Sequence, residues 1–85
     1  MRIAVVGLGK IGLPLAVQFA RKGHMVIGTD INPETVEMVN AGREPFPNED
    51  HLADYLSTEV LAGRLRSTTD TSGAVRESNA VVVVV

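Results

Sequence analysis

Short apolar runs alternate along the chain with longer segments in which apolar residues recur every four positions. Residues 3–6 and 80–85 are apolar throughout and rich in β-branched side chains, which is typical of parallel strands buried on both faces. Residues 25–29 form another predicted strand, and residues 64–68 a weaker one. We therefore predict four strands, separated by segments long enough to hold helices.

The first two helical segments carry clear start and stop signals. One begins near Ile11, has small residues at a spacing of four that allow close packing on a sheet, and ends at Gly23. The other follows Asn32, a good N-cap residue, has Pro33 at its first position, and is ended by Gly42. Each of these two helices is predicted to follow directly from a strand.

The remaining segments are less sharply bounded. Apolar residues at a spacing of four predict a third helix from about Asp50 to Gly63. Either Thr69 or Asp70 can cap a short fourth helix. Residues 43–49 contain two prolines and are predicted to be irregular.

The resulting order β-α-β-α-α-β-α-β predicts an α/β fold, because parallel neighbouring strands need crossover connections. We expect a parallel sheet with helices on both faces. The valine-rich run at residues 80–85 would leave a hydrophobic sheet edge of a kind that proteins normally cover. We therefore expect a chain that is truncated after its fourth strand.

Composition narrows the possible functions. A length of 85 residues suffices for one core but not for a two-domain enzyme. With no cysteine, the sequence excludes a disulfide framework, a zinc–thiolate cluster and a thiol nucleophile. A net charge of −2 argues against nucleic acid and anionic membranes as partners. The chain shows neither a signal peptide nor an apolar stretch of membrane-spanning length, so we expect a cytoplasmic protein.

The segment after the first predicted strand fits the dinucleotide-binding pattern G-x-G-x-x-G. It reads Gly7-Leu8-Gly9-Lys10-Ile11-Gly12. The motif opens a predicted helix, and Asp30 ends the second predicted strand eighteen residues after Gly12. In this pattern Gly7 permits a tight turn, Gly9 leaves room for a pyrophosphate and Gly12 lets the helix pack closely. The helix start offers free N–H groups to the anion, so the motif predicts a partial Rossmann fold with strand order 3-2-1-4.

Asp30 indicates which dinucleotide the motif would take. Its carboxylate can accept hydrogen bonds from both hydroxyls of the adenosine ribose and would repel a 2′-phosphate. No Arg or Lys occurs in the seven residues that follow it, so we predict NAD rather than NADP. The alternative interpretation is an ordinary glycine-rich turn in which Asp30 caps a helix or a turn.

Other polar residues near the motif and beyond it favour structural interpretations. A P-loop is excluded because Lys10 is not followed by Ser or Thr, and we expect this lysine to be solvated. His24 and His51 have no further His or Cys at ligand spacing, so we expect no metal site. Tyr55 is predicted to pack half-buried on the third helix rather than to donate a proton.

The sequence also resembles the UDP-glucose/GDP-mannose dehydrogenases, which are NAD-dependent nucleotide-sugar 6-dehydrogenases, over its whole length. The resemblance rests on residues 3–9 with 11–16, on 28–32, on 41–42 with 45–46 and 49, and on 63–66 with 68–70. The continuation Gly-Leu-Pro-Leu-Ala after the motif and the Gly-Arg-Leu-Arg segment are its most specific parts. Within the family, the sequence is most similar to the bacterial branch that acts on UDP-N-acetylhexosamines, such as UDP-N-acetylmannosamine dehydrogenase. Lys10 and Thr35 depart from residues that are common in the family.

The resemblance implies an enzyme that oxidises the C6 hydroxyl of a nucleotide sugar to a carboxylate, with NAD as acceptor and a cysteine-bound intermediate. Family members are several times longer, and their catalytic cysteine and substrate pocket have no counterpart among these 85 residues. Residues 1–85 are therefore expected to form an N-terminal NAD-binding domain without catalytic residues. The cofactor-binding residues carried over are Gly7, Gly9, Ile11, Gly12 and Asp30.

Two rival hypotheses stay open. A β-hydroxyacid dehydrogenase shares the glycine motif, but the Gly-Arg-Leu-Arg segment and the Pro45-Phe46 segment argue against it. A stand-alone nucleotide-binding or interaction module would instead associate through its valine-rich last strand. We expect a homo-oligomer.

Overall fold

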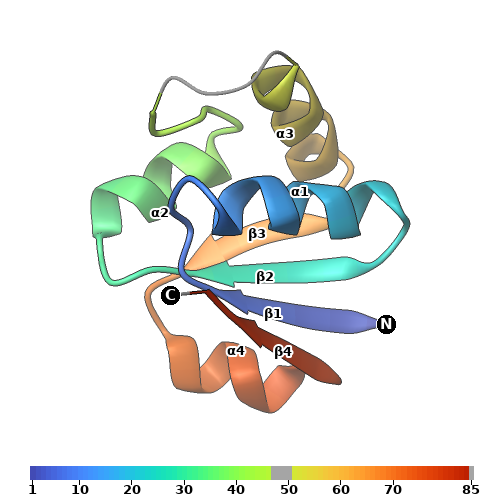
Figure 1. The fold of residues 1–85 in the computed structure, drawn as a ribbon, viewed down its shortest axis with the longest axis vertical. Helices are drawn as coiled ribbons and strands as arrows, with labels where there is room; N and C mark the ends of the chain where they lie inside the picture. The colour runs from blue at the N-terminus through green and yellow to red at the C-terminus, as the bar shows by residue number, and fades with distance from the viewer. Residues whose placement is uncertain (47–50, 85) are drawn as a thin grey trace.

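One parallel sheet organises the part of the chain that the computed structural model describes, residues 1–46 and 51–84. Its strands lie in the order β3-β2-β1-β4, and each neighbouring pair is parallel (Figure 1). The strands are β1 (Arg2–Val6), β2 (Met25–Thr29), β3 (Leu65–Thr68) and β4 (Ala80–Val83). The predicted α/β class and the strand order 3-2-1-4 are confirmed.

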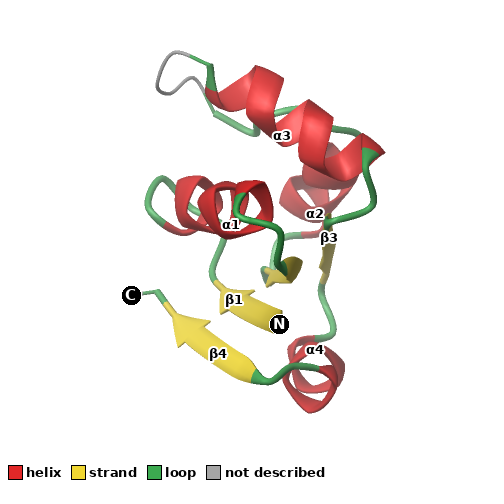
Figure 2. Cartoon of the chain, turned by 90° about the vertical axis from the view of Figure 1, so that its right-hand side faces the viewer, coloured by secondary structure: helices red, strands yellow, loops and turns green. Residues whose placement is uncertain are grey.

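Helices cover both faces of this sheet. One face carries α1 (Gly12–Arg21), α2 (Pro33–Asn40) and α3 (Leu52–Leu61). The opposite face carries α4 (Thr71–Glu77), as the edge-on view in Figure 2 shows. All the predicted strands and helices are present. The end of the predicted irregular segment, the predicted start of the third helix at Asp50 and the last residue of the predicted fourth strand fall on positions 47–50 and 85, which lie outside the described residues.

Local capping sets where two of the helices begin. The Asn32 side chain accepts a hydrogen bond from the Glu34 N–H at 3.0 Å, and Pro33 holds the first position of α2, as predicted. At α4 the cap is Asp70, whose Oδ1 accepts from the Gly73 N–H at 3.0 Å. The structure thereby decides between Thr69 and Asp70, which the sequence left open.

The main core lies between the sheet and the three helices α1, α2 and α3. Its fully buried large side chains are Leu8, Leu13, Leu56, Leu65, Val5, Val26 and Val39. On the α4 face the buried group is small and consists of Ala4, Ile27 and Ala74. Val81 and Val83 of the edge strand β4 are 42% and 66% exposed. The apolar edge expected from the valine run is therefore present in the described sheet.

An ion pair between a buried carboxylate and a partly exposed guanidinium closes the turn from α3 to β3. Glu59 is 4% exposed, and its carboxylate accepts from Nε and Nη2 of Arg64 at 2.6 and 3.2 Å. The hydrogen bond to Glu59 raises the pKa of the Arg64 guanidinium. The Arg64 N–H also donates to the Glu59 carbonyl at 3.1 Å. Side chain and backbone thus fix the direction in which the chain enters β3.

Candidate functional site

The loops that follow β1 and β2 meet at the carboxyl edge of the sheet, where ligands bind in open parallel sheets. The β1 loop contains the glycine motif, and the β2 loop contains Asp30. The Gly7 N–H donates to the Thr29 carbonyl at 2.8 Å, so the two loops leave the sheet side by side. The topology thereby brings together the two parts of the predicted fingerprint.

The three motif glycines meet three different demands. Gly7 has a φ of +102°, a backbone conformation that L side chains rarely adopt. A Cβ on Gly12 would overlap the Gly7 carbonyl oxygen, so α1 can start this close to the loop only without a side chain there. A Cβ on Gly9 would meet no atom within 4 Å. The protein's own packing therefore needs glycine at positions 7 and 12, whereas glycine at position 9 keeps open the space in front of the backbone.

Backbone donors face this open space. Within residues 1–46 and 51–84, the N–H groups of Gly9, Lys10, Ile11 and Gly12 donate no hydrogen bond, while the Leu13 N–H already bonds to the Gly9 carbonyl at 3.1 Å. Free N–H groups at the positive end of a helix attract anions. A shallow cleft of about 220 Å³ borders them and is lined by Gly7, Gly9, Lys10, Ile11, Gly12 and Val84. The donor set and the open cleft fit a diphosphate.

Asp30 is held by the backbone on both sides of its carboxylate. Oδ2 accepts from the Leu8 N–H and Oδ1 from the Asn32 N–H, each at 3.0 Å. Asp30 therefore does act as a turn acid, as the alternative interpretation proposed. A carboxylate offers about four acceptor positions, so roughly two remain after these bonds. This capacity is enough for a pair of neighbouring hydroxyls.

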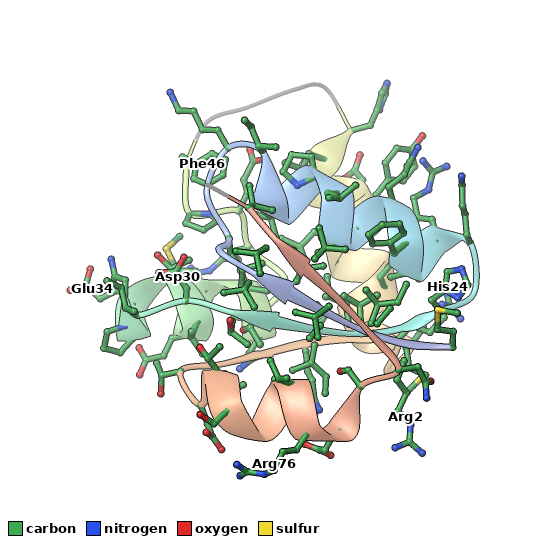
Figure 3. All side chains as sticks on the ribbon, turned by 60° about the horizontal axis from the view of Figure 1, so that its bottom comes forward. Arg2, His24, Asp30, Glu34, Phe46 and Arg76 are labelled. Carbon is green, nitrogen blue, oxygen red and sulfur yellow. The ribbon has the colours of Figure 1, made fainter. Side chains whose placement is uncertain are left out.

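A second cleft of about 170 Å³ adjoins the first. Its lining residues are Val6, Gly7, Thr29, Asp30, Ile31, Thr71 and Val84, so the two clefts share Gly7 and Val84. Ile31 is 93% exposed next to the carboxylate and offers an apolar surface there. In Figure 3, Asp30 lies at the end of the sheet opposite to His24 and Arg2. The loop with the free donors and the carboxylate thus border two neighbouring clefts that share part of their lining.

Sequence reasoning missed Leu8 and Gly28 as part of this site. Leu8 occupies a variable position of the motif, yet it is 1% exposed. A Cβ on Gly28 would approach the two Leu8 Cδ atoms to 2.7 and 2.8 Å, so the leucine rests directly on the backbone of β2. The signal in the sequence was the glycine inside a predicted strand, which often marks a close approach.

The other predicted residues lie away from these clefts or make only surface contacts. Lys10 is exposed at the rim of the first cleft. Tyr55 is 38% exposed, and the Arg21 guanidinium lies 3.6 Å from its ring centroid, which supports a packing role. The His51 ring lies 6.0 Å from the Tyr55 ring. Among the described residues, no cluster of three or more potential ligands could hold a metal ion.

Among the residues that the structure describes, two further hollows have no motif glycine in their lining. One, of about 180 Å³, lies at the amino end of the sheet near Arg2 and Arg66. The other is an apolar groove of about 440 Å³ between α1 and α3. No helix in the described ranges has the length and apolar character needed to cross a membrane.

Comparison with known proteins identifies the family to which this arrangement belongs. The NAD-binding domain of the UDP-glucose/GDP-mannose dehydrogenase family matches residues 1–85. The chain belongs to this family. Among curated relatives, GDP-mannose 6-dehydrogenase from Pseudomonas putida is 36% identical over 85 residues. UDP-N-acetyl-D-mannosamine dehydrogenase from Escherichia coli is 45% identical over 67 residues, 79% of this chain and 16% of that protein.

Solved structures of the family show the same fold. A ternary complex of GDP-mannose dehydrogenase from Pseudomonas aeruginosa superposes with a TM-score of 0.95 at 35% identity. It is matched over 100% of this chain and 19% of that chain. A UDP-glucose dehydrogenase from Pyrobaculum islandicum gives a TM-score of 0.93 at 37% identity, over 99% of this chain and 19% of that one. The chain spans 19% of the length of the Pseudomonas putida relative, a segment that corresponds to the family's NAD-binding domain.

Proposed function

We propose that the chain binds NAD at the carboxyl ends of β1 and β2. The free N–H groups that begin at Gly9 and end at Gly12 hold the diphosphate, and Gly7 shapes the turn that presents them. Ile11 contributes its N–H and an exposed apolar side chain at the rim of the cleft. Asp30 accepts hydrogen bonds from the adenosine ribose. The observation that carries this proposal is that the cleft at the free donors and the cleft at the carboxylate are neighbours that share Gly7 and Val84.

The charge of Asp30 makes NAD the preferred dinucleotide over NADP. A 2′-phosphate would lie against a carboxylate whose two oxygens already accept backbone hydrogen bonds and cannot turn away without losing them. Residues 31–37, which follow Asp30, contain no Arg or Lys that could compensate the phosphate charge. The same carboxylate that accepts from the ribose hydroxyls therefore excludes the phosphorylated form.

We further propose that the protein acts in the oxidation of the C6 hydroxyl of a nucleotide sugar, as the names of its relatives and the sequence resemblance suggest. Bound NAD would supply the hydride acceptor. The residues of this chain would bind and orient the adenosine diphosphate half of the cofactor. With no cysteine among the 85 residues, the cysteine-bound step implied by the resemblance would need residues outside them. The family relationship covers both GDP-sugar and UDP-sugar enzymes.

Isothermal titration calorimetry with NAD tests the proposed site. We expect the purified protein to bind NAD, and Asp30→Ala to weaken binding by about tenfold or more, because hydrogen bonds to a charged acceptor are lost. The matched control is Asp54→Ala, which removes an exposed carboxylate from α3 and should leave the affinity unchanged. Equal affinities for the protein and for Asp30→Ala, or no binding by either, would contradict the proposal.

A further inference from the structure

The Leu8 side chain and the Gly28 backbone form a contact that links the glycine loop to β2. The two Leu8 Cδ atoms lie where a Cβ on Gly28 would come within 2.7 and 2.8 Å of them. Leu8 is 1% exposed, so this contact is sealed from solvent. Only glycine at position 28 lets the leucine lie this low over the strand.

The same leucine holds the Asp30 carboxylate through its backbone. Its N–H donates to Oδ2 at 3.0 Å, and the Asn32 N–H donates to Oδ1 at the same distance. One residue of the loop therefore contacts two positions of the β2 end: position 28 by its side chain and position 30 by its N–H. Both oxygens of the carboxylate are fixed before any ligand arrives.

From this geometry we infer that Leu8 and Gly28 are positioning residues for recognition of the adenosine ribose. The inference rests on the proposed NAD site. If the leucine is raised, its N–H leaves Oδ2, and the carboxylate regains rotational freedom. Ligand binding must then order the carboxylate again, which costs conformational entropy. The free acceptor positions of the carboxylate also no longer point in one fixed direction. The Leu8–Gly28 contact thereby controls selectivity for a ribose that carries both hydroxyls.

Gly28→Ala is the direct test, because the three atoms nearest to the added methyl group all belong to the Leu8 side chain. Binding of ADP and of 2′-deoxy-ADP is measured by calorimetry. The unmodified protein should prefer ADP by about tenfold, the value of a hydrogen bond to a charged acceptor. In Gly28→Ala we expect this preference to fall towards equality. If the Leu8–Gly28 contact had only a structural role, Gly28→Ala would weaken the binding of both ligands equally and leave the preference for ADP unchanged.

Leu8→Ala gives a second measurement that introduces no clash. We expect a smaller loss of preference, because the N–H stays but the loop loses its anchor. The double variant Leu8→Ala/Gly28→Ala should be no worse than Leu8→Ala alone, since the new methyl group occupies the space that the leucine left. Val60→Ala, a substitution in the partly buried face of α3, should lower the melting temperature and keep the full preference.

The outcomes separate this inference from the proposed function. Should the unmodified protein prefer ADP and Gly28→Ala keep that preference, the inference is wrong and the NAD site stands. Additive losses in the double variant would also overturn it, because two residues in one contact should not act independently. If the unmodified protein binds neither NAD nor ADP, both the proposed function and the inference fall.

Discussion

The side-chain carboxamide of Asn40 pairs with both main-chain groups of Ser67. Oδ1 accepts from the Ser67 N–H at 2.8 Å, and Nδ2 donates to the Ser67 carbonyl at 3.0 Å. Ser67 belongs to the edge strand β3, and the carbonyl of the next residue, Thr68, accepts from the Asp30 N–H at the end of β2 at 3.3 Å. The groups of Ser67 therefore point away from the sheet, and the last residue of α2 takes the place of a neighbouring strand.

Removing this carboxamide should destabilise the protein. Asn40→Ala leaves a part-buried N–H and carbonyl of Ser67 without partners, so we expect the free energy of unfolding to fall by about 1–3 kcal/mol. Asn79→Ala is the matched control, since Asn79 accepts one exposed hydrogen bond from the Arg2 N–H. Urea denaturation followed by circular dichroism measures both variants. If both variants lost the same free energy of unfolding, the contact between Asn40 and Ser67 would contribute no more to stability than an exposed hydrogen bond.

Substitution by alanine should affect NAD binding at Gly9 but folding at Gly12. Gly9→Ala adds a methyl group that meets no protein atom, so the fold should be retained while NAD affinity falls by about tenfold or more. Gly12→Ala places its methyl group on the Gly7 carbonyl and should impair folding itself. Circular dichroism and calorimetry on both variants check this. A Gly9→Ala variant with unchanged NAD affinity would mean that the diphosphate does not approach this backbone.

Neutralising Asp30 should reduce the discrimination between NAD and NADP. Asp30→Asn removes the charge that opposes a 2′-phosphate but keeps the size of the side chain. We expect NAD to bind about tenfold more weakly, while the ratio of NAD to NADP affinity shrinks. Titration with both dinucleotides measures the ratio. If the ratio of NAD to NADP affinity stayed the same in Asp30→Asn, the charge of Asp30 would not be the cause of the preference for NAD.

The two ion pairs among the described residues should contribute differently to the stability of the fold. Arg64→Met leaves the Glu59 carboxylate buried without its cation, so we expect a clear fall in melting temperature. Arg66→Met breaks a pair whose two side chains are 56% and 55% exposed, and such pairs contribute about 0–1 kcal/mol. Thermal unfolding of both variants gives the comparison. A larger loss in Arg66→Met would contradict this ranking.

Local chemistry made much of the fold predictable. Apolar β-branched runs indicated the strands, and Asn32 with Pro33 marked the start of α2 through capping and a restricted φ. The glycine motif and its spacing to Asp30 pointed to the carboxyl ends of two neighbouring strands. The strand and capping signals act within a few residues along the chain, and the spacing from the motif to Asp30 is a known pattern of one β-α-β unit, so each can be recognised in the sequence before any tertiary contact is known.

Contacts between distant residues decided the rest. Leu8 and Asp30 are 22 positions apart, and Asn40 and Ser67 are 27 apart. No sequence pattern predicts the hydrogen bonds between these residues. The motif by itself indicated that a diphosphate can approach Gly9. Only the packing of the loop on β2 determined that Leu8 lies over Gly28 and holds the Asp30 carboxylate, because steric fit and hydrogen-bond geometry exist only once the strands are side by side.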